Sequence, residues 1–220
     1  MRSYLKAVIF DLDGTLADTI PAITEAVNMT MRKLGFPERT EHEIRSFIGR
    51  GPRHLISQSL PYGVILKNPH ILDKALSIYD DMYEKTYLHT TSLYDGLEEV
   101  IITLSKYYKI AVLSNKQDRY VKELVKQLLP EGVCQIARGS INGVPVKPDP
   151  AVALQIAKEL EVNPHECILV GDSDIDILTA ENAEFDILSV SWGYVNKMRL
   201  AYRGVLDIAD DPNELLEYFK

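Results

Sequence analysis

Two aspartates one residue apart, Asp11 and Asp13, follow the apolar run 7–10 near the N-terminus, and Gly14 comes directly after them. The run is too short for a helix of its own and predicts a buried strand, while the glycine lets the chain turn sharply. Two carboxylates held so close repel each other unless a cation lies between them. A solvated strand-to-helix turn also uses Asp and Gly, so the chemistry depends on partners elsewhere in the chain.

Polar side chains stand where two further apolar runs end. Ser114 and Asn115 end one run, and Asp172 follows another. In an open parallel sheet such strand ends share one edge, where ligands bind. Lys147 precedes a proline, which restricts the lysine to an extended conformation. Carboxylates suit Mg²⁺, and Ser, Asn and Lys suit the oxygens of a phosphoryl group, so the pattern predicts a metal site on a phosphate-handling scaffold.

These residues together suit the attack of a carboxylate on a phosphoryl group. A carboxylate that attacks a phosphate dianion meets a repulsion of about 4 kcal/mol per pair of unit charges at about 4 Å and an effective dielectric near 20. Mg²⁺ bridging Asp11 and the phosphate, with Lys147 opposite, offsets this repulsion. The attack gives an aspartyl-phosphate. Asp13, on the leaving-group side, can protonate the departing alkoxide and later activate water.

The elements that position these residues follow from the hydrophobic pattern. Strands alternate with helices over most of the chain, which predicts an α/β fold with a doubly wound, Rossmann-like parallel sheet covered on both faces. Strands are expected at residues 7–10, 109–114, 134–137, 167–171, 185–190 and 205–208. Helices are expected at residues 96–107, 118–129 and 149–160. Two more are expected, one that follows the acids at 172–176 and ends at about residue 183, and one from residue 212 onward.

The alternation is interrupted after the first strand. Helical patterns at residues 17–34, 41–48, 52–60 and 69–87 follow one another without a convincing strand. They predict a helical cap at residues 16–88, inserted into a core formed by residues 1–15 and 89–220. A separate all-helical domain is the alternative, but it would leave the first strand without sheet neighbours until residue 109.

Composition excludes several other classes of function. A formal net charge of −8 over 220 residues argues against a nucleic-acid partner. The two cysteines lack CxxC spacing and the five histidines are scattered, which argues against a disulfide framework or a zinc site. No apolar run approaches membrane-spanning length, so we expect a cytoplasmic protein without a membrane partner. Monomer and homodimer remain equally open.

Four segments, in order and spacing, resemble the motifs of the haloacid dehalogenase-like hydrolases. They are Asp-Leu-Asp-Gly-Thr-Leu at 11–16, Ser114-Asn115, Lys147-Pro148 and Gly171-Asp172-Ser173-x-x-Asp176. The resemblance implies Asp11 as the nucleophile and Asp13 as the acid and base. It also implies Ser114 and Lys147 as ligands of the phosphoryl group.

The same resemblance implies a Mg²⁺ site. Its ligands would be Asp11, the backbone carbonyl of Asp13 and Asp172, with Asp176 as a supporting acid behind them. Members that cleave carbon–halogen bonds lack the second aspartate of the first motif because they have no alkoxide to protonate. The presence of Asp13 therefore favours phosphoryl transfer.

The helical insert resembles the cap of the phosphoglycolate phosphatase and phosphoglucomutase branch. Its segment Gly49-Arg50-Gly51 looks like the cap loop that meets the substrate in phosphoglycolate phosphatases. We therefore expect Arg50 to pair with the distal anionic group of the substrate. A helix–helix turn with a solvated arginine is the alternative.

Two further features lie outside the four motifs. Trp192-Gly193-Tyr194 is similar to a segment common in that branch, and we interpret it as aromatic packing. Glu184 stands where relatives often have a glycine that ends a helix, so we expect the turn there to be made in another way.

Together these observations predict a Mg²⁺-dependent phosphatase of a small phosphorylated metabolite, with phosphoglycolate favoured. A sugar-phosphate mutase similar to β-phosphoglucomutase, a pyrophosphatase or a nucleotidase would use the same chemistry. A non-catalytic regulator on this fold is the alternative from another class. Every acid that the chemistry needs is present, which favours an enzyme.

Overall fold

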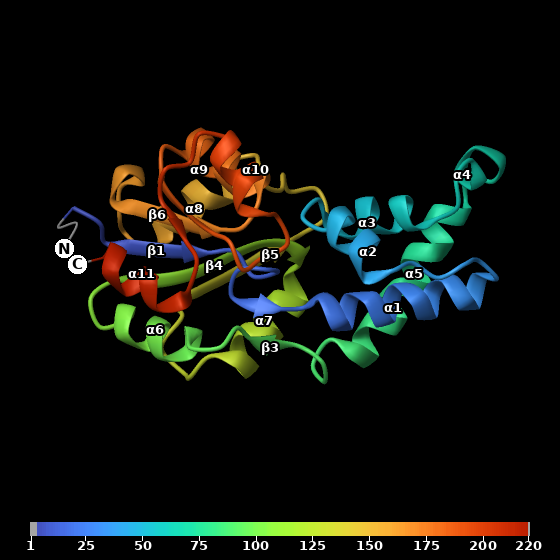
Figure 1. Ribbon diagram of the computed structural model, residues 1–220, viewed down its shortest axis with the longest axis horizontal. Coiled ribbons are helices and arrows are strands. Elements are labelled where there is room, and N and C mark those ends of the chain that lie inside the picture. Colours follow the sequence, from blue (N-terminus) through green and yellow to red (C-terminus); the bar gives the residue numbers. More distant parts are fainter. Residues whose placement is uncertain (1–3, 220) are drawn as a thin grey trace. The chain divides into compact units, whose positions relative to one another are not determined.

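A computed structural model describes residues 4–219, and these divide into two compact units. The first unit contains the residues up to Asp18 and those from Leu93 onward, and the second contains Thr19–Ser92. Figure 1 labels their helices and strands. In the described part of the chain, no helix has the length and apolar character needed to cross a membrane.

The first unit is built on a six-stranded sheet with the strand order β5-β4-β1-β6-β7-β8. Neighbouring strands are parallel throughout this sheet. The strands are β1 (Ala7–Phe10), β4 (Lys109–Gln117), β5 (Ile136–Ser140), β6 (Cys167–Gly171), β7 (Asp186–Val190) and β8 (Ile208–Ala209). A second, two-stranded sheet pairs β2 (Ala17–Asp18) with β3 (Ser92–Leu93). The predicted Rossmann-like α/β class is confirmed.

Helices cover both faces of the parallel sheet (Figure 1). They are α6 (Leu97–Leu104), α7 (Asp118–Leu128), α8 (Ala151–Glu159), α9 (Asp174–Ala183), α10 (Lys197–Tyr202) and α11 (Pro212–Tyr218), with a 3₁₀ turn at Pro164–Glu166. Ala7 and Ile9 of β1 pack in one cluster with Ile156 of α8 and Ala180 of α9. The alternate residues of β1 point to the opposite face, where Figure 1 shows α6 and α11. All four residues of β1 are buried, which explains their unbroken apolar character.

The strand order reverses at β1, which lies between β4 and β6. Phe10 is paired with Val112 on one side and with Val170 on the other, and the backbone N–H of Asp11 donates to the carbonyl of Val170 at 2.9 Å. Phe10, Val112 and Val170 therefore lie side by side across the three strands, and β4 continues beyond this level to Gln117. Such a reversal is where open α/β sheets bind ligands.

The second unit contains five helices within Thr19–Ser92. They are α1 (Ile20–Leu34), α2 (Glu41–Phe47), α3 (Gly51–Ser59), α4 (Val64–Lys67) and α5 (Ile71–Thr86). Helix α1 buries an apolar stripe that includes Ile23, Val27 and Met31, and it packs along α5. Helix α2 begins with a capping box in which Thr40 and Glu43 satisfy each other's backbone N–H groups.

Several predicted boundaries are wrong, each for a local reason. Residues 17–18 form β2 instead of the first helical turn, because α1 begins only after Thr19, where Pro21 suits the first turn. The strand predicted at 134–137 is β5, which begins two residues later, at Ile136, because Gln135 belongs to the loop before the strand. There its side-chain oxygen accepts a hydrogen bond from the backbone N–H of Ile110 at 2.6 Å. The last strand is likewise displaced, from residues 205–208 to β8.

Glu184 also corrects an expectation. The helix α9 ends on this residue in the left-handed conformation, with φ 57° and ψ 37°, and its N–H donates to the carbonyls of Ala180 and Glu181. The turn is therefore the one that a glycine would make. A side chain in this conformation costs about 1 kcal/mol, which the rest of the fold tolerates.

Candidate active site

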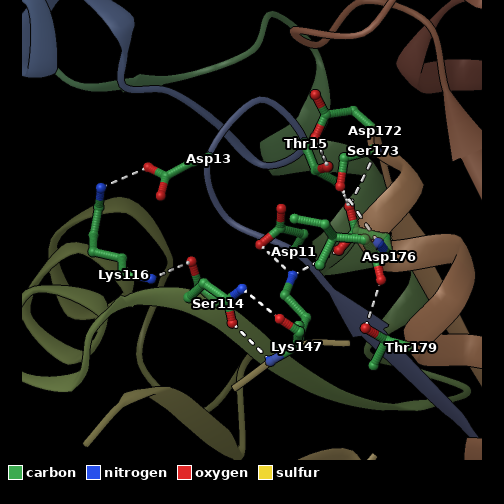
Figure 2. Close-up of polar contacts among 12 residues, drawn as sticks. Asp11, Asp13, Thr15, Ser114, Lys116, Lys147, Asp172, Ser173, Asp176 and Thr179 are labelled. Carbon is green, nitrogen blue, oxygen red and sulfur yellow. Dashed lines mark hydrogen bonds and ion pairs between the residues drawn. The ribbon is translucent and has the colours of Figure 1, made fainter. Parts of the chain in front are cut away.

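Three buried carboxylates gather at the carboxyl edge of the central strands (Figure 2). Asp11 follows β1, Asp172 follows β6, and Asp176 lies in the first turn of α9. All three are at least nine-tenths buried, and each offers one oxygen within 4.8 Å of the others. Buried carboxylate oxygens this close fit a divalent cation such as Mg²⁺, since such cations prefer oxygen ligands. The group thus brings together two of the predicted metal ligands, Asp11 and Asp172, with the predicted supporting acid, Asp176.

Lys147 places a positively charged ammonium group among these acids. Its Nζ lies 2.9 Å from Oδ1 of Asp11 and 2.6 Å from Oδ1 of Asp176, and its side chain is 3% exposed. Burial by itself would lower the pKa of Lys147, but the charges of Asp11 and Asp176 raise it above its ordinary value. Burial also raises the pKa of Asp11, and Lys147 acts against that rise. The lysine therefore stays protonated and compensates part of the buried negative charge.

Asn115 holds the backbone that carries this lysine. Its Nδ2 donates to the carbonyl oxygen of Lys147, and its Oδ1 accepts from the N–H of Lys147, both at 2.9 Å. The two residues are 32 positions apart in the chain, so the amide links the end of β4 to the loop after β5. The nearby hydroxyl oxygen of Ser114 accepts from the N–H of Lys116 at 3.2 Å. Ser114, Asn115 and Lys147, the residues predicted to bind the phosphoryl group, thus lie together.

Asp13 lies apart from the three acids. Its Oδ1 is 2.7 Å from Nζ of Lys116, and both side chains are nearly buried, with exposures of 11% and 7%. Figure 2 shows the carboxylate of Asp13 pointing away from Asp11 toward this lysine. Sequence reasoning did not assign Lys116 to the site. The available signal was a lysine directly after two small polar residues, at the end of an otherwise apolar strand.

Arg50 belongs to the second unit, and its predicted role stays a prediction. It precedes α3 as the N-cap residue, is exposed, and is flanked by Gly49 and Gly51 at φ 105° and 80°. These positive φ values are the physical reason for two glycines around it. Burial and the charge of Arg50 both lower the pKa of His54 in the first turn of that helix.

Burial, and next the charge of Asp176, raise the pKa of the Asp172 carboxyl from 3.8 to about 7. Hydrogen bonds from the backbone N–H of Tyr194 and the hydroxyl of Thr15 act in the opposite direction. A bound cation would favour the ionised form of the same carboxyl. Binding of a metal at this site and protonation of Asp172 are therefore expected to compete.

We expect a divalent cation to raise the melting temperature Tm more at about pH 8 than at about pH 6. In the metal-free protein Asp172 has a higher pKa folded than unfolded, so its stabilising contribution is full below about pH 4 and is lost as the pH rises through about 7. Three pKa units correspond to about 4 kcal/mol. Thermal unfolding with MgCl₂ and with EDTA at both pH values measures the difference. Equal metal-induced shifts at the two pH values would contradict the expectation.

Comparison with known proteins gives a consistent result. Residues 8–190 match the family model of the haloacid dehalogenase-like hydrolases. A phosphoglycolate phosphatase of Vibrio vulnificus strain CMCP6 is 29% identical over 221 residues, covering 97% of this chain and 95% of the relative. One from Nitrosospira multiformis is 33% identical over 193 residues, covering 86% and 85%. A solved haloacid dehalogenase-like hydrolase from Streptococcus pneumoniae has a TM-score of 0.88 at 25% identity, covering 99% of this chain and 100% of its own.

The fold is thus that of an α/β hydrolytic enzyme with its polar residues at the switch point of a parallel sheet. The chain belongs to the haloacid dehalogenase-like hydrolase family and is a phosphatase. The family and the enzyme class predicted from the sequence are both confirmed. As members of this family use a divalent metal, the buried group of Asp11, Asp172 and Asp176 is where this chain would hold one.

Proposed function

We propose that this chain is a cytoplasmic, Mg²⁺-dependent phosphatase that hydrolyses a small phosphorylated metabolite through an aspartyl-phosphate on Asp11. The observation that supports this most is the placement of Asp11. Its carboxylate lies at the switch point of the sheet, next to a buried lysine and within a group of three acids. A carboxylate surrounded in this way is suited to attack an anionic phosphoryl group.

Each residue has a proposed part in the reaction. Asp11 attacks phosphorus, and the ester bond to the leaving alkoxide breaks. Asp13 gives its proton to that alkoxide and later takes a proton from the water that hydrolyses the aspartyl-phosphate. Lys147, with Ser114 and Asn115 beside it, faces the oxygens of the phosphoryl group. Lys147 neutralises charge on those oxygens.

The metal would be held by Asp11, the backbone carbonyl of Asp13 and Asp172, with Asp176 as a supporting acid. When bound, Mg²⁺ supplies positive charge that offsets the repulsion between the nucleophile and the phosphate. Asp176 already contacts Lys147, and both its Oδ2 and the hydroxyl of Ser173 take part in a capping box at the start of α9. These contacts suit a residue that orients its neighbours.

Phosphoglycolate is the favoured substrate. The relatives from Vibrio vulnificus and Nitrosospira multiformis are phosphoglycolate phosphatases, and the first is matched along nearly its whole length. We propose that the second unit serves as a cap and that Arg50 recognises the carboxylate of this substrate. A carboxylate is an anionic group that a guanidinium binds with two parallel hydrogen bonds.

Arg50→Ala should raise KM for phosphoglycolate by about 10- to 100-fold, as expected for the loss of a hydrogen bond to a charged group. The KM for para-nitrophenyl phosphate, which lacks the distal anion, should change by less than about twofold. Steady-state kinetics with both substrates measures the ratio. Arg45→Ala is the matched control, since Arg45 pairs with Glu41 on the surface of α2. Equal effects of Arg50→Ala on both substrates would rule out this role.

A panel of small phosphate esters tested with Mg²⁺ checks the proposed function as a whole. Release of inorganic phosphate, fastest from phosphoglycolate, is the expected result. Conversion of a hexose 1-phosphate to its isomer would instead identify a mutase. Fastest release from pyrophosphate would identify a pyrophosphatase, and fastest release from a nucleotide would identify a nucleotidase. No phosphate release from any of these compounds would indicate a non-catalytic protein.

A further inference from the structure

The carboxylate of Asp172 is held on both oxygens by two separate parts of the first unit. Oδ1 accepts a hydrogen bond from the hydroxyl of Thr15 at 3.1 Å, and Oδ2 accepts one from the backbone N–H of Tyr194 at 2.6 Å. Thr15 lies in the loop after β1, and Tyr194 lies in the loop after β7. Both loops therefore converge on one side chain at the end of β6. Figure 2 shows Thr15 directed at Asp172.

Two glycines leave the space that this carboxylate occupies. A Cβ atom added to Gly193 would lie 2.3 Å from Oδ2 of Asp172, and one added to Gly14 would lie 2.6 Å from the same oxygen. Gly14 also has a positive φ of 89°, which by itself favours glycine. The φ of Gly193 lies outside that left-handed region. Residue 193 is therefore confined to glycine by the position of the Asp172 side chain, whose Cβ is equally close at 2.3 Å, and not by the conformation of its own backbone.

The indole of Trp192 links the loop after β7 to the loop after β1. Its Nε1–H donates to the backbone carbonyl of Thr15 at 3.1 Å, and its ring lies 6.4 Å from that of Tyr94, centroid to centroid. Aromatic packing, the interpretation made from the sequence, thus describes only part of what this segment does. Trp192 also fixes the backbone whose side chain contacts Asp172.

We propose that Trp192-Gly193-Tyr194 is a positioning segment that fixes the Asp172 carboxylate in the orientation needed to bind a divalent cation. The inference rests on the metal site of the proposed function and adds to it a segment outside the four motifs. Groups that hold a metal ligand by hydrogen bonds commonly change metal affinity by about 10- to 100-fold when removed. The hydroxyl of Thr15 and the N–H of Tyr194 hold the Asp172 carboxylate in one orientation before a cation binds, and the absence of a side chain at Gly193 makes room for that orientation.

Gly193→Ala tests the proposal directly. The added methyl group would lie 2.3 Å from both Cβ and Oδ2 of Asp172, so either the whole Asp172 side chain or the loop that carries residue 193 must shift, and the carboxylate loses its present position. We expect the dissociation constant Kd for Mg²⁺, or for Mn²⁺ as a spectroscopic substitute, to rise by about tenfold or more. Isothermal titration calorimetry on chelator-treated protein measures Kd without any substrate. A merely structural role would lower the Tm of the metal-free protein and leave the Kd unchanged.

Gly204→Ala is the matched control. Gly204 belongs to the same unit and has a φ of 87°, but an added Cβ there meets nothing within 4 Å. The substitution strains the backbone without touching Asp172. Its Kd for the metal should stay within about twofold of the wild-type value, even if its Tm falls.

A second pair of variants covers the case in which Gly193→Ala does not fold. Thr15→Val keeps the volume of the buried side chain and removes the donor to Asp172, whereas Thr15→Ser keeps the hydroxyl. Weaker metal binding by Thr15→Val, with Thr15→Ser close to wild type, supports the proposal. A wild-type Kd in both Thr15→Val and folded Gly193→Ala overturns it, while a wild-type protein that binds no divalent metal overturns the metal site of the proposed function and the inference with it.

Discussion

Asp11→Asn is expected to lower the rate of phosphate release at saturating substrate by about 10⁴-fold or more. A carboxamide has the size of the carboxylate but cannot attack phosphorus, and removal of a covalent nucleophile commonly has an effect of this size. The fold should persist, because the amide removes one charge from a buried group in which burial already raises the pKa of Asp11. A continuous assay of inorganic phosphate with Mg²⁺ measures the rate.

Asp210→Asn is the matched control for this substitution. Asp210 is an exposed aspartate that pairs with Lys197 and accepts a hydrogen bond from Ser191. Its replacement makes the same chemical change at an exposed position outside the group of three acids, and turnover should stay within about twofold. Wild-type turnover by Asp11→Asn would refute the assignment of the nucleophile.

Lys147→Met should have the largest effect on stability. Methionine fills much of the same space but leaves Asp11 and Asp176 without the buried cation that lies 2.9 Å and 2.6 Å from them. Removal of one partner from a buried ion pair costs about 3–5 kcal/mol. We expect a loss of this size in the free energy of unfolding of the metal-free protein, measured by urea titration in EDTA. Phosphate release should also fall by about 10³-fold if Lys147 has its proposed role of neutralising charge on the phosphoryl group.

Lys197→Met provides the comparison with an exposed ion pair. Lys197 pairs with Asp210 at the surface, where both side chains are about half exposed. Water screens such pairs, so this substitution should leave the free energy of unfolding nearly unchanged. If Lys147→Met were as mild as Lys197→Met, Lys147 would not compensate the buried acids.

Much of the site could be predicted because its chemistry requires particular residue types at strand ends. Asp11, Ser114 and Asp172 each stand at or just beyond the end of an apolar run, and the parallel register of β1, β4 and β6 brings those ends together. Apolar runs buried on both faces are a strong local signal, so the central strands were found. Edge strands such as β8, with two residues, offer little apolar pattern to locate them.

The contacts that support the site could not be predicted in the same way. The link from Asn115 to the backbone of Lys147 and the pairing of Lys116 with Asp13 depend on how the last residues of β4 orient their side chains toward the loops after β5 and β1. Gly193 looks like any loop glycine until its distance to Asp172 is known. The sequence pattern indicates which reacting groups the chain contains. The contacts that orient these groups depend on the conformation of the loops and appear only in the folded structure.

Glu184 shows a different limit. The missing glycine suggested another kind of turn, yet the residue adopts the left-handed conformation itself. Local preference was overridden by the need to begin β7 two residues later at Asp186. Such a cost of about 1 kcal/mol is small beside the burial of the surrounding core.

The central claim is that Asp11 becomes covalently phosphorylated during turnover. The most direct measurement mixes the protein with ³²P-labelled phosphoglycolate and Mg²⁺, quenches the mixture in acid within milliseconds, and reduces the trapped acyl phosphate with borohydride. Reduction converts a phosphorylated aspartate to homoserine, which peptide mass spectrometry locates. We predict homoserine at position 11 in the wild-type protein and none in Asp11→Asn. Phosphate release without any labelled protein, or a label on another residue, would contradict the account.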